Sequence, residues 1–183
     1  MDRRLYFVLL AGLAIVGVCV YRLRANRPLD FDAQVAAATT SVPAPLFEGV
    51  DENNTVFRLS SYLGRHRIIL AFYDGAVGAD RSRELLTLRD RAEELKRQDV
   101  KVVGISTAIP QENRRALKAL GALSFPLVSD VDGSIHRHWG RWSAANQPLA
   151  GLFLIDRKGT VAFHAGAPRP YSTLEALWKD LDR

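Results

Sequence analysis

Residues 67–90 read RIILAFYDGAVGADRSRELLTLRD, and this stretch decides the fold. Its first part, 68–73, is a short apolar run rich in β-branched and aromatic residues, which predicts a strand buried on both faces. Gly75 and Gly78 interrupt the run, and apolar residues then return at helical spacing from Leu85 onward. The segment therefore predicts a strand, a glycine loop and a helix. Such a loop lies beyond the carboxyl end of a strand, where binding and catalytic groups usually sit.

The same segment resembles the first strand-loop-helix unit of a peroxiredoxin of the alkyl hydroperoxide reductase/thiol-specific antioxidant type. In that family an aromatic pair ends the strand, and a Pro, a Thr or Ser, the peroxidatic Cys and an acidic residue follow at fixed spacing. Phe72, Tyr73 and Glu84 match this pattern. The resemblance extends over residues 43–182 and implies a thioredoxin-like α/β fold, with a central mixed sheet flanked by helices.

The positions that carry the family's chemistry hold other residues. Asp74 stands where the Pro would be, Gly78 where the Thr would be, and Arg81 where the Cys would be. The family's second Arg begins a later strand, matched here by 151–156, and Ala150 aligns with it. Peroxide reduction needs a thiolate nucleophile, whereas a guanidinium stays protonated and has no lone pair for attack. The resemblance and these substitutions together predict a degenerate catalytic site.

Cysteine usage points the same way. Cys19 is the only cysteine among the 183 residues, so the predicted soluble domain has no thiol, disulfide or cysteine-based metal site. No Ser-His-Asp set, phosphate loop, dinucleotide fingerprint or haem motif is visible. We therefore expect no cofactor, no resident metal and no other enzyme class.

The chain is basic, with a formal net charge of +5. Such a balance suits acidic partners such as nucleic acid, anionic lipid or an acidic protein face. The Arg residues are scattered, however, and many have acidic neighbours three or four positions away, as Arg89 has Glu93. A solvated basic surface and a docking face for an acidic protein or lipid both fit. No nucleic-acid-binding signature is present, so no nucleic-acid partner is expected.

Residues 5–21 form an unbroken apolar run. As a helix the run would be roughly 25 Å long, which is near the shortest length that crosses a bilayer. Tyr6 and Tyr21 lie near the two ends, as interfacial aromatic residues do. A cleaved signal peptide would need small residues just after the run, but residues 21–25 read YRLRA. The pattern predicts an uncleaved membrane anchor over residues 1–24.

The orientation of this single span is nearly balanced, because Arg residues flank both of its ends. Membrane-tethered thioredoxin-like domains are commonly exported, and by that analogy we expect the soluble domain on the periplasmic or extracytoplasmic side. Residues 25–42 are polar and small, which predicts a linker. Residues 43–183 then form one thioredoxin-like domain.

The rest of the domain shows a regular alternation of strand and helix signals. We expect a hairpin over 48–50 and 55–59, a helical turn at 60–64, a first helix ending near 98, a strand at 100–106, a helix at 111–120 closed by Gly121, a strand and turn at 125–130, a helix or turn at 135–142, a hairpin over 151–156 and 160–164, and a closing helix at 173–181.

Arg81 and Arg83 are the first candidate contact residues. If the helix begins near Asp80, that residue is a natural N-cap and Arg81 lies in the first turn, where the helix dipole disfavours a cation. Pairing with Asp74 or Glu84 would offset that cost. Alternatively, Arg81 points outward and holds a partner's carboxylate or phosphate.

A second candidate cluster comprises His136, His138, Arg141 and Trp142. The two His residues lie two positions apart, so a helix would place them on different sides. The cluster fits an ordinary helix surface with Trp packed inward, or an interaction patch. A metal site would need a further ligand from elsewhere.

These observations favour a membrane-anchored, redox-inactive peroxiredoxin-like domain that serves as an accessory or interaction subunit of a membrane protein complex. One alternative is a thiol-dependent redox protein that works with a partner's cysteine. Another is a solitary tethered ligand-binding domain.

Overall fold

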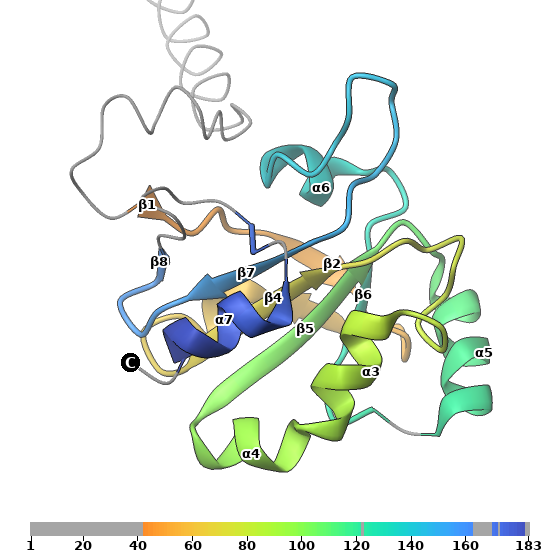
Figure 1. Ribbon diagram of the computed structural model, residues 1–183. Coiled ribbons are helices and arrows are strands. Elements are labelled where there is room, and N and C mark those ends of the chain that lie inside the picture. The colour runs from red at the N-terminus through yellow and green to blue at the C-terminus, as the bar shows by residue number, and fades with distance from the viewer. Residues whose placement is uncertain (1–41, 122, 163–169, 172, 182–183) are drawn as a thin grey trace, which may run out of the picture.

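The computed structural model describes residues 42–121, 123–162, 170–171 and 173–181. One mixed sheet forms its centre, with the strand order β1-β8-β7-β4-β5-β6-β2-β3 (Figure 1). The strands are β1 Val42–Pro43, β2 Glu48–Val50, β3 Val56–Arg58, β4 Arg67–Phe72, β5 Val100–Ser106, β6 Leu127–Ser129, β7 Gly151–Ile155 and β8 Thr160–Val161. The helices are η1 Leu59–Ser61, α3 Arg83–Asp90, α4 Ala92–Arg97, α5 Pro110–Leu120, α6 Ser134–His138 and α7 Leu174–Leu181.

Three parallel strands, β4, β5 and β6, occupy the middle of this sheet, and every other pairing is antiparallel. Parallel strands need crossover connections, which the helical segments after β4 and β5 supply. The carboxyl ends of β4, β5 and β6 therefore meet at one edge of the sheet. The segments after β4 and β6, which hold both candidate clusters, start from this edge.

Strand β4 is the buried axis of the core. Its residues from Ile68 to Phe72 are at most 2% exposed, because the sheet is covered on both faces. One apolar cluster lies between the sheet and helices α3, α4, α5 and α7, which Figure 1 shows on the near side. The second cluster lies on the opposite face, under η1, the β2-β3 hairpin and α6. The predicted thioredoxin-like α/β architecture is thus confirmed.

The helix after β4 differs from the prediction at both ends. It begins at Arg83, and Ser82 is its N-cap, with Ser82 Oγ accepting from the backbone N–H of Leu85 at 3.4 Å. The expected start near Asp80 with Asp80 as the cap was therefore wrong. A break at Arg91 also divides the expected single helix into α3 and α4.

Most other elements lie where they were predicted. Strand β5 covers the expected 100–106, and α5 ends at Gly121, whose φ of 88° suits glycine. Helix α6 covers only the first part of the expected 135–142 segment.

The predicted anchor and linker, and residues 163–164 of the last expected strand, lie outside the described residues. Within the described part of the chain, no helix combines the length and apolar character that a bilayer crossing requires.

Candidate functional site

The loop that follows β4, residues 74–82, carries three of the four positions that the family resemblance predicts to be degenerate, and Ala150 is the fourth. The strand continues in hydrogen bonding to Tyr73, whose N–H donates to the carbonyl of Ile105 at 3.0 Å. Asp74 then turns the chain, because its Oδ1 accepts from the N–H of Ala76 at 2.8 Å and its carbonyl accepts from Gly78 at 3.2 Å. Asp74 at the family's Pro position is therefore a turn-forming residue.

Gly78, at the family's Thr position, has a conformation that L side chains rarely adopt. Its φ is +90°, and a Cβ built there would lie 2.7 Å from Asp80 Oδ1. Both the backbone and the neighbouring carboxylate therefore favour glycine at this position. A hydroxyl-bearing side chain could be restored here only if the loop changed its shape.

Arg81, at the Cys position, is exposed and lies just before the helix. Within the described residues its guanidinium makes no ion pair or hydrogen bond. The two expected carboxylate partners are otherwise engaged, since Asp74 caps the turn and Glu84 accepts from Ser82 Oγ at 3.1 Å. The predicted internal ion pair is thus absent from the structure, whereas the outward-facing alternative fits it.

Three of the positions predicted to be degenerate, and the matching Glu84, line two different hollows. Gly78 and Arg81 line a hollow of about 590 Å³ between the loop and α5, which we call the Arg81 cleft. Glu84 and Ala150 line a second hollow of about 360 Å³ between α3, the start of β7 and α7. Arg83, the neighbouring candidate, is exposed and borders this second hollow. The fold therefore does not bring all the degenerate positions into one pocket.

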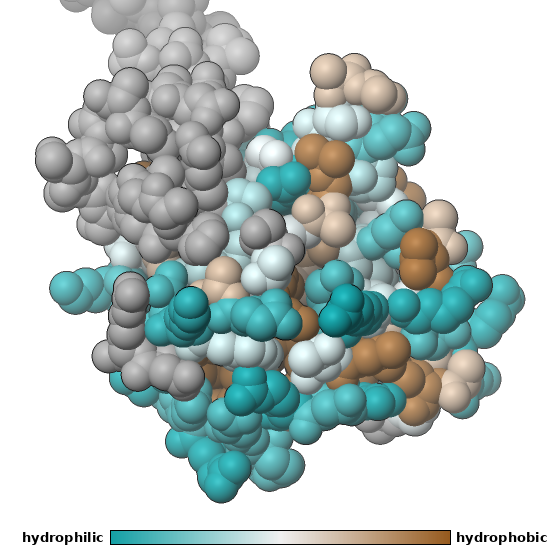
Figure 2. Space-filling view, in the orientation of Figure 1, coloured by the Kyte–Doolittle hydropathy of each residue, from teal (hydrophilic) through white to brown (hydrophobic). Residues whose placement is uncertain are grey.

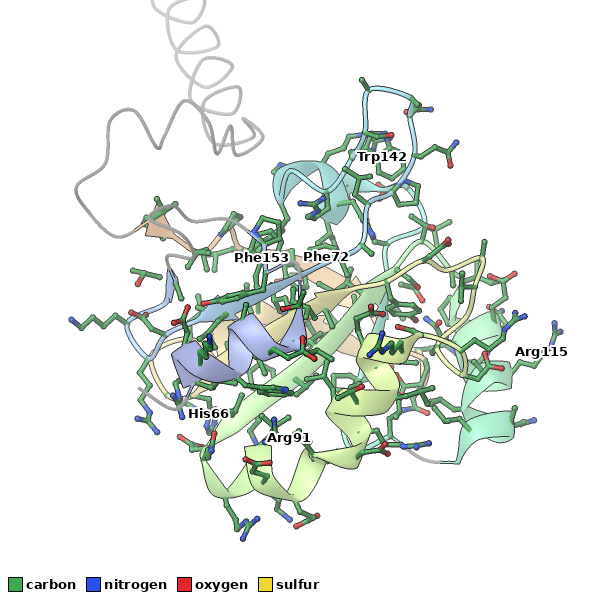
Figure 3. All side chains as sticks on the ribbon, viewed as in Figure 1. His66, Phe72, Arg91, Arg115, Trp142 and Phe153 are labelled. Carbon is green, nitrogen blue, oxygen red and sulfur yellow. The ribbon has the colours of Figure 1, made fainter. Side chains whose placement is uncertain are left out.

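The Arg81 cleft combines two cationic side chains that are free to bind. Arg115 lines it from α5 and points outward into solvent (Figure 3). Like Arg81, Arg115 has no ion-pair partner among the described residues. Asp80 and Glu112 also line the cleft, and Glu112 accepts from the N–H of Ile109 at 3.2 Å. This arrangement can hold a carboxylate or phosphate by charge-assisted hydrogen bonds, but it offers no nucleophile.

A buried hydrogen-bonded network supports the loop from below. The Tyr73 hydroxyl donates to Asn113 Oδ1 at 2.7 Å, and Asn113 Nδ2 donates to Ser129 Oγ at 3.3 Å. Burial raises the pKa of the Tyr73 phenol to about 12, opposed by a hydrogen bond with Ser106 and assisted slightly by the Glu52 carboxylate. Tyr73 therefore stays protonated at physiological pH and ties β4 to α5 and β6.

The second candidate cluster contains a buried acid-base pair that the sequence analysis missed. His136 was expected on a helix surface, but it is fully buried, with Nδ1 2.6 Å from Asp130 Oδ2. Asp130 also accepts from the backbone N–H groups of Ile135 and His136 at 3.0 and 2.8 Å. Burial opposes ionisation of Asp130, yet the bonds from His136 and Ile135 outweigh it and hold its pKa below the usual range.

The rest of the predicted patch is also divided. His138 Nδ1 lies 2.7 Å from the Ser134 carbonyl and serves its own helix. The Trp142 ring covers Gly133 and stacks under Arg137, whose Cζ is 4.3 Å from the ring centre. In the described ranges no three His, Cys, Asp or Glu side chains gather as metal ligands. The Trp142 ring does meet the His136 ring edge-on, with centroids 6.1 Å apart, but His136 is buried. The four residues are therefore partly in contact without forming one shared surface.

Arg141 was named as a contact residue, but it is partly buried against β7. A Cβ on Gly151 would lie 3.4 Å from Arg141 Nε, so the glycine leaves room for the guanidinium. Nε is buried without a hydrogen-bond partner, and burial lowers the pKa of Arg141. Neither this placement nor the buried Asp130–His136 pair could be read from sequence spacing, because both depend on contacts between elements.

Comparison with known proteins agrees with the fold. The profile of the AhpC/TSA family matches residues 40–164. The chain is 31% identical over 113 residues to a putative peroxiredoxin, ycf42, of Trieres chinensis, covering 58% of this chain and 55% of that protein. It is 32% identical over 129 residues to the chloroplastic 2-Cys peroxiredoxin BAS1 of Spinacia oleracea, covering 64% and 48%. The chain thus spans about half the length of these relatives.

A further relative is matched over more of its length. Peroxiredoxin Bcp of Escherichia coli K12 is 33% identical over 126 residues, which cover 64% of this chain and 79% of that protein. Among solved structures, peroxidoxin BcpB of Mycobacterium tuberculosis superposes with a TM-score of 0.62 at 24% identity, over 78% of this chain and 94% of that one. This structural likeness supports the fold, while the sequence matches identify the relatives.

Proposed function

Because the chain belongs to the AhpC/TSA family but carries Arg81 at the peroxidatic Cys position, we propose that it is a redox-inactive, peroxiredoxin-like domain that binds a partner. The observation that carries this proposal is the exposed Arg81 guanidinium, which has no partner in the described part of the chain. An exposed cation in a cleft is available to a carboxylate or phosphate. It cannot attack a peroxide.

The proposed host is a membrane protein complex, in which the chain is an accessory subunit. The apolar residues 5–21 support a single N-terminal span, and the domain would face the periplasmic or extracytoplasmic side. A single span holds the domain at the membrane surface, where the Arg81 cleft can meet an acidic face of a neighbouring subunit. No nucleic-acid partner is part of this proposal.

The test compares particle size in mildly solubilised native membranes. The wild-type chain should co-migrate with a large assembly under native electrophoresis, whereas Arg81→Glu should release at least part of it by reversing the contact charge. Arg97→Glu is the matched control, because Arg97 is also exposed and lies on α4 rather than at the cleft. Migration of the wild-type chain as a monomer would overturn the subunit role.

Loss of peroxidase activity is tested on the purified protein. Hydrogen peroxide consumption should equal that of a buffer control, and Arg81→Cys alone should restore little. Gly78 and Ala150 leave the peroxide oxygens without the hydroxyl and guanidinium donors that the family resemblance implies. Robust turnover by the wild-type protein would show that the catalytic site lies elsewhere, and robust turnover by Arg81→Cys would show that the donors missing at Gly78 and Ala150 are not required.

A thiol-dependent role is the second candidate, favoured by the fact that the relatives in the comparison are named as peroxiredoxins. Here a partner's cysteine would supply the thiol and this domain only the recognition. Blocking the partner's thiols should then abolish the complex, whereas an electrostatic contact at Arg81 would survive. A solitary tethered ligand-binding domain remains the third reading, for which the Arg81 cleft would be the pocket.

A further inference from the structure

Strand β5 is paired along its whole length on one side only. It pairs with β4 from Val100 to Ile105, but with β6 only from Gly104 to Ser106. Gly104 N–H donates to the Pro126 carbonyl at 3.0 Å, so Gly104 faces the β6 side. Strand residues alternate in direction, and therefore Val102 directs its backbone N–H and C=O to the same side. No described residue hydrogen-bonds to them.

Pro126 explains why the pairing stops. In a parallel ladder that continued from Gly104, the Val102 carbonyl would accept from the N–H of residue 126. Proline has no N–H, so this bond cannot form. The preceding residues Ser124 and Phe125 bend, and no strand pairing extends to them. An interior strand of the sheet is thereby left with an open edge over its first half.

The open edge borders a cleft of about 330 Å³, which we call the β5 slot. Phe57 and Tyr62, whose rings stack at 5.3 Å, line one wall. Phe125 and Pro126 line another, with the backbone around Val102 between them. The volume lies at the lower end of the range for ligand pockets. From Val100 to Val103 the edge is about 10 Å long, which matches about four extended residues.

The free charge at the slot is mainly positive. Lys96 and Lys101 line it, are exposed, and have no ion-pair partner among the described residues. The Asp99 carboxylate is already engaged, because His66 Nδ1 lies 2.6 Å from it and Arg157 donates to it at 3.4 Å. Glu93 is the one slot carboxylate without an ion-pair partner among the residues that the structure describes, against two unpaired lysines, so the slot complements an acidic side chain.

We propose that the β5 slot binds an extended, acidic peptide segment of a partner protein by strand addition. One residue of the segment donates its N–H to the Val102 carbonyl and accepts from the Val102 N–H. Its apolar side chains contact Phe57, Tyr62 and Phe125, and its acidic side chains meet Lys96 and Lys101. Main-chain bonds to an open strand edge supply affinity, and the flanking walls supply selectivity. The start of β5 and α4, which line the β5 slot, lie away from the β4 loop and the start of α5, which line the Arg81 cleft (Figure 1).

The test uses the full-length protein in mild detergent and the labelled peptide acetyl-Val-Glu-Val-Glu-Val-amide. Binding is followed by fluorescence anisotropy, and hydrogen exchange of residues 100–106 reports the site. The peptide should bind and protect this segment. N-methylation of one of the three central residues should weaken binding about tenfold, because it removes the N–H that pairs with Val102. The lysine analogue acetyl-Val-Lys-Val-Lys-Val-amide should bind more weakly than the glutamate peptide.

Protein variants test the same geometry from the other side. Pro126→Ala supplies the missing N–H, closes the ladder onto Val102 and should abolish peptide binding while the chain stays folded. Pro110→Ala, at the start of α5 outside the slot, should leave binding unchanged. If Pro126→Ala does not fold, Lys101→Glu provides the test instead, and it must weaken binding of the glutamate peptide.

Two results would overturn the strand-addition proposal. One is the absence of binding at millimolar peptide, and the other is affinity that no N-methyl group changes. Arg81→Glu should not alter peptide binding. Failure of the slot is therefore distinguishable from failure of the proposed Arg81 contact.

Discussion

The loop after β4 and the turn after β6 leave the same edge of the sheet, yet they use charged residues in opposite ways. Arg81 in the first is exposed and has no ion-pair partner in the described chain. Asp130 in the second is 2% exposed and accepts hydrogen bonds from His136 and Ile135. The Asp130 carboxylate in the turn is used to hold the start of α6, whereas the Arg81 guanidinium in the loop faces solvent. A charged residue at a strand's carboxyl end is therefore a contact candidate only where the fold leaves it unsatisfied.

Figure 2 shows the near face of the molecule, which carries helices α3, α4 and α5. Hydrophilic residues cover α4, while apolar groups reach the surface beside α3 and α5. The Arg81 cleft lies between the β4 loop and α5, and alanine residues line it beside its two cations. Contact surfaces commonly combine an apolar centre with charged groups at the rim, which is consistent with a binding role for the loop.

Removing the buried Asp130 carboxylate should give the largest loss of stability. Asp130→Ala leaves His136 and two backbone N–H groups without their acceptor in a buried corner. We expect a loss of about 3–5 kcal/mol in the free energy of unfolding, measured with urea. Asp132→Ala is the matched control, because Asp132 is exposed and its side chain accepts only from Ser134 N–H, so its cost should stay within about 1 kcal/mol. Equal effects would remove the contrast between the two regions.

Breaking the hydrogen-bonded network under the β4 loop should give the next largest loss of stability. Tyr73→Phe removes the hydroxyl that donates to Asn113 Oδ1 and leaves that buried oxygen unsatisfied. The expected loss is about 1–3 kcal/mol in chemical denaturation. Tyr62→Phe should change stability by less than about 0.5 kcal/mol, because the described structure shows no hydrogen bond from the Tyr62 hydroxyl. In ultraviolet titration, Tyr73 should ionise at about pH 12, later than an exposed tyrosine.

The pH dependence of stability gives a further test of the buried Asp130 carboxylate. The folded pKa of Asp130 is held below its unfolded value, so its contribution to stability is present above about pH 3.9 and is lost as the pH falls through the folded pKa. One such group changes the unfolding free energy by at most about 1.4 kcal/mol per pH unit. Asp130→Asn should flatten the acid limb of the stability profile. An unchanged limb would contradict the role of this carboxylate.

The smallest effect is expected at Arg81. Arg81→Ala removes an exposed side chain that makes no ion pair within the described residues, so the midpoint of thermal unfolding should hardly move. The corresponding free-energy change should remain below about 0.5 kcal/mol. A large destabilisation would show that the guanidinium has a structural partner and would weaken its assignment as a contact residue.

Much of the fold could be predicted because the signals are local. The apolar run at 68–73 and the glycine punctuation at Gly75 and Gly78 define a strand and a loop whatever surrounds them. The family resemblance added the order of the elements and the identity of the degenerate positions. The helix start was misplaced, because Asp80 and Ser82 are both good N-caps and only the packed loop selects between them.

The sequence by itself determined that Cys19 is the only cysteine among the 183 residues, and with the family resemblance it predicts a degenerate peroxidatic position at Arg81. Only the tertiary structure decided which charges are satisfied. Asp130 meets His136 across a turn, and Arg81 meets no carboxylate among the described residues. Val102 pairs with β4 but has no strand neighbour on the β6 side, beside Pro126. These outcomes depend on which elements pack together, and burial then fixes whether a polar group is paired inside or left open to a partner.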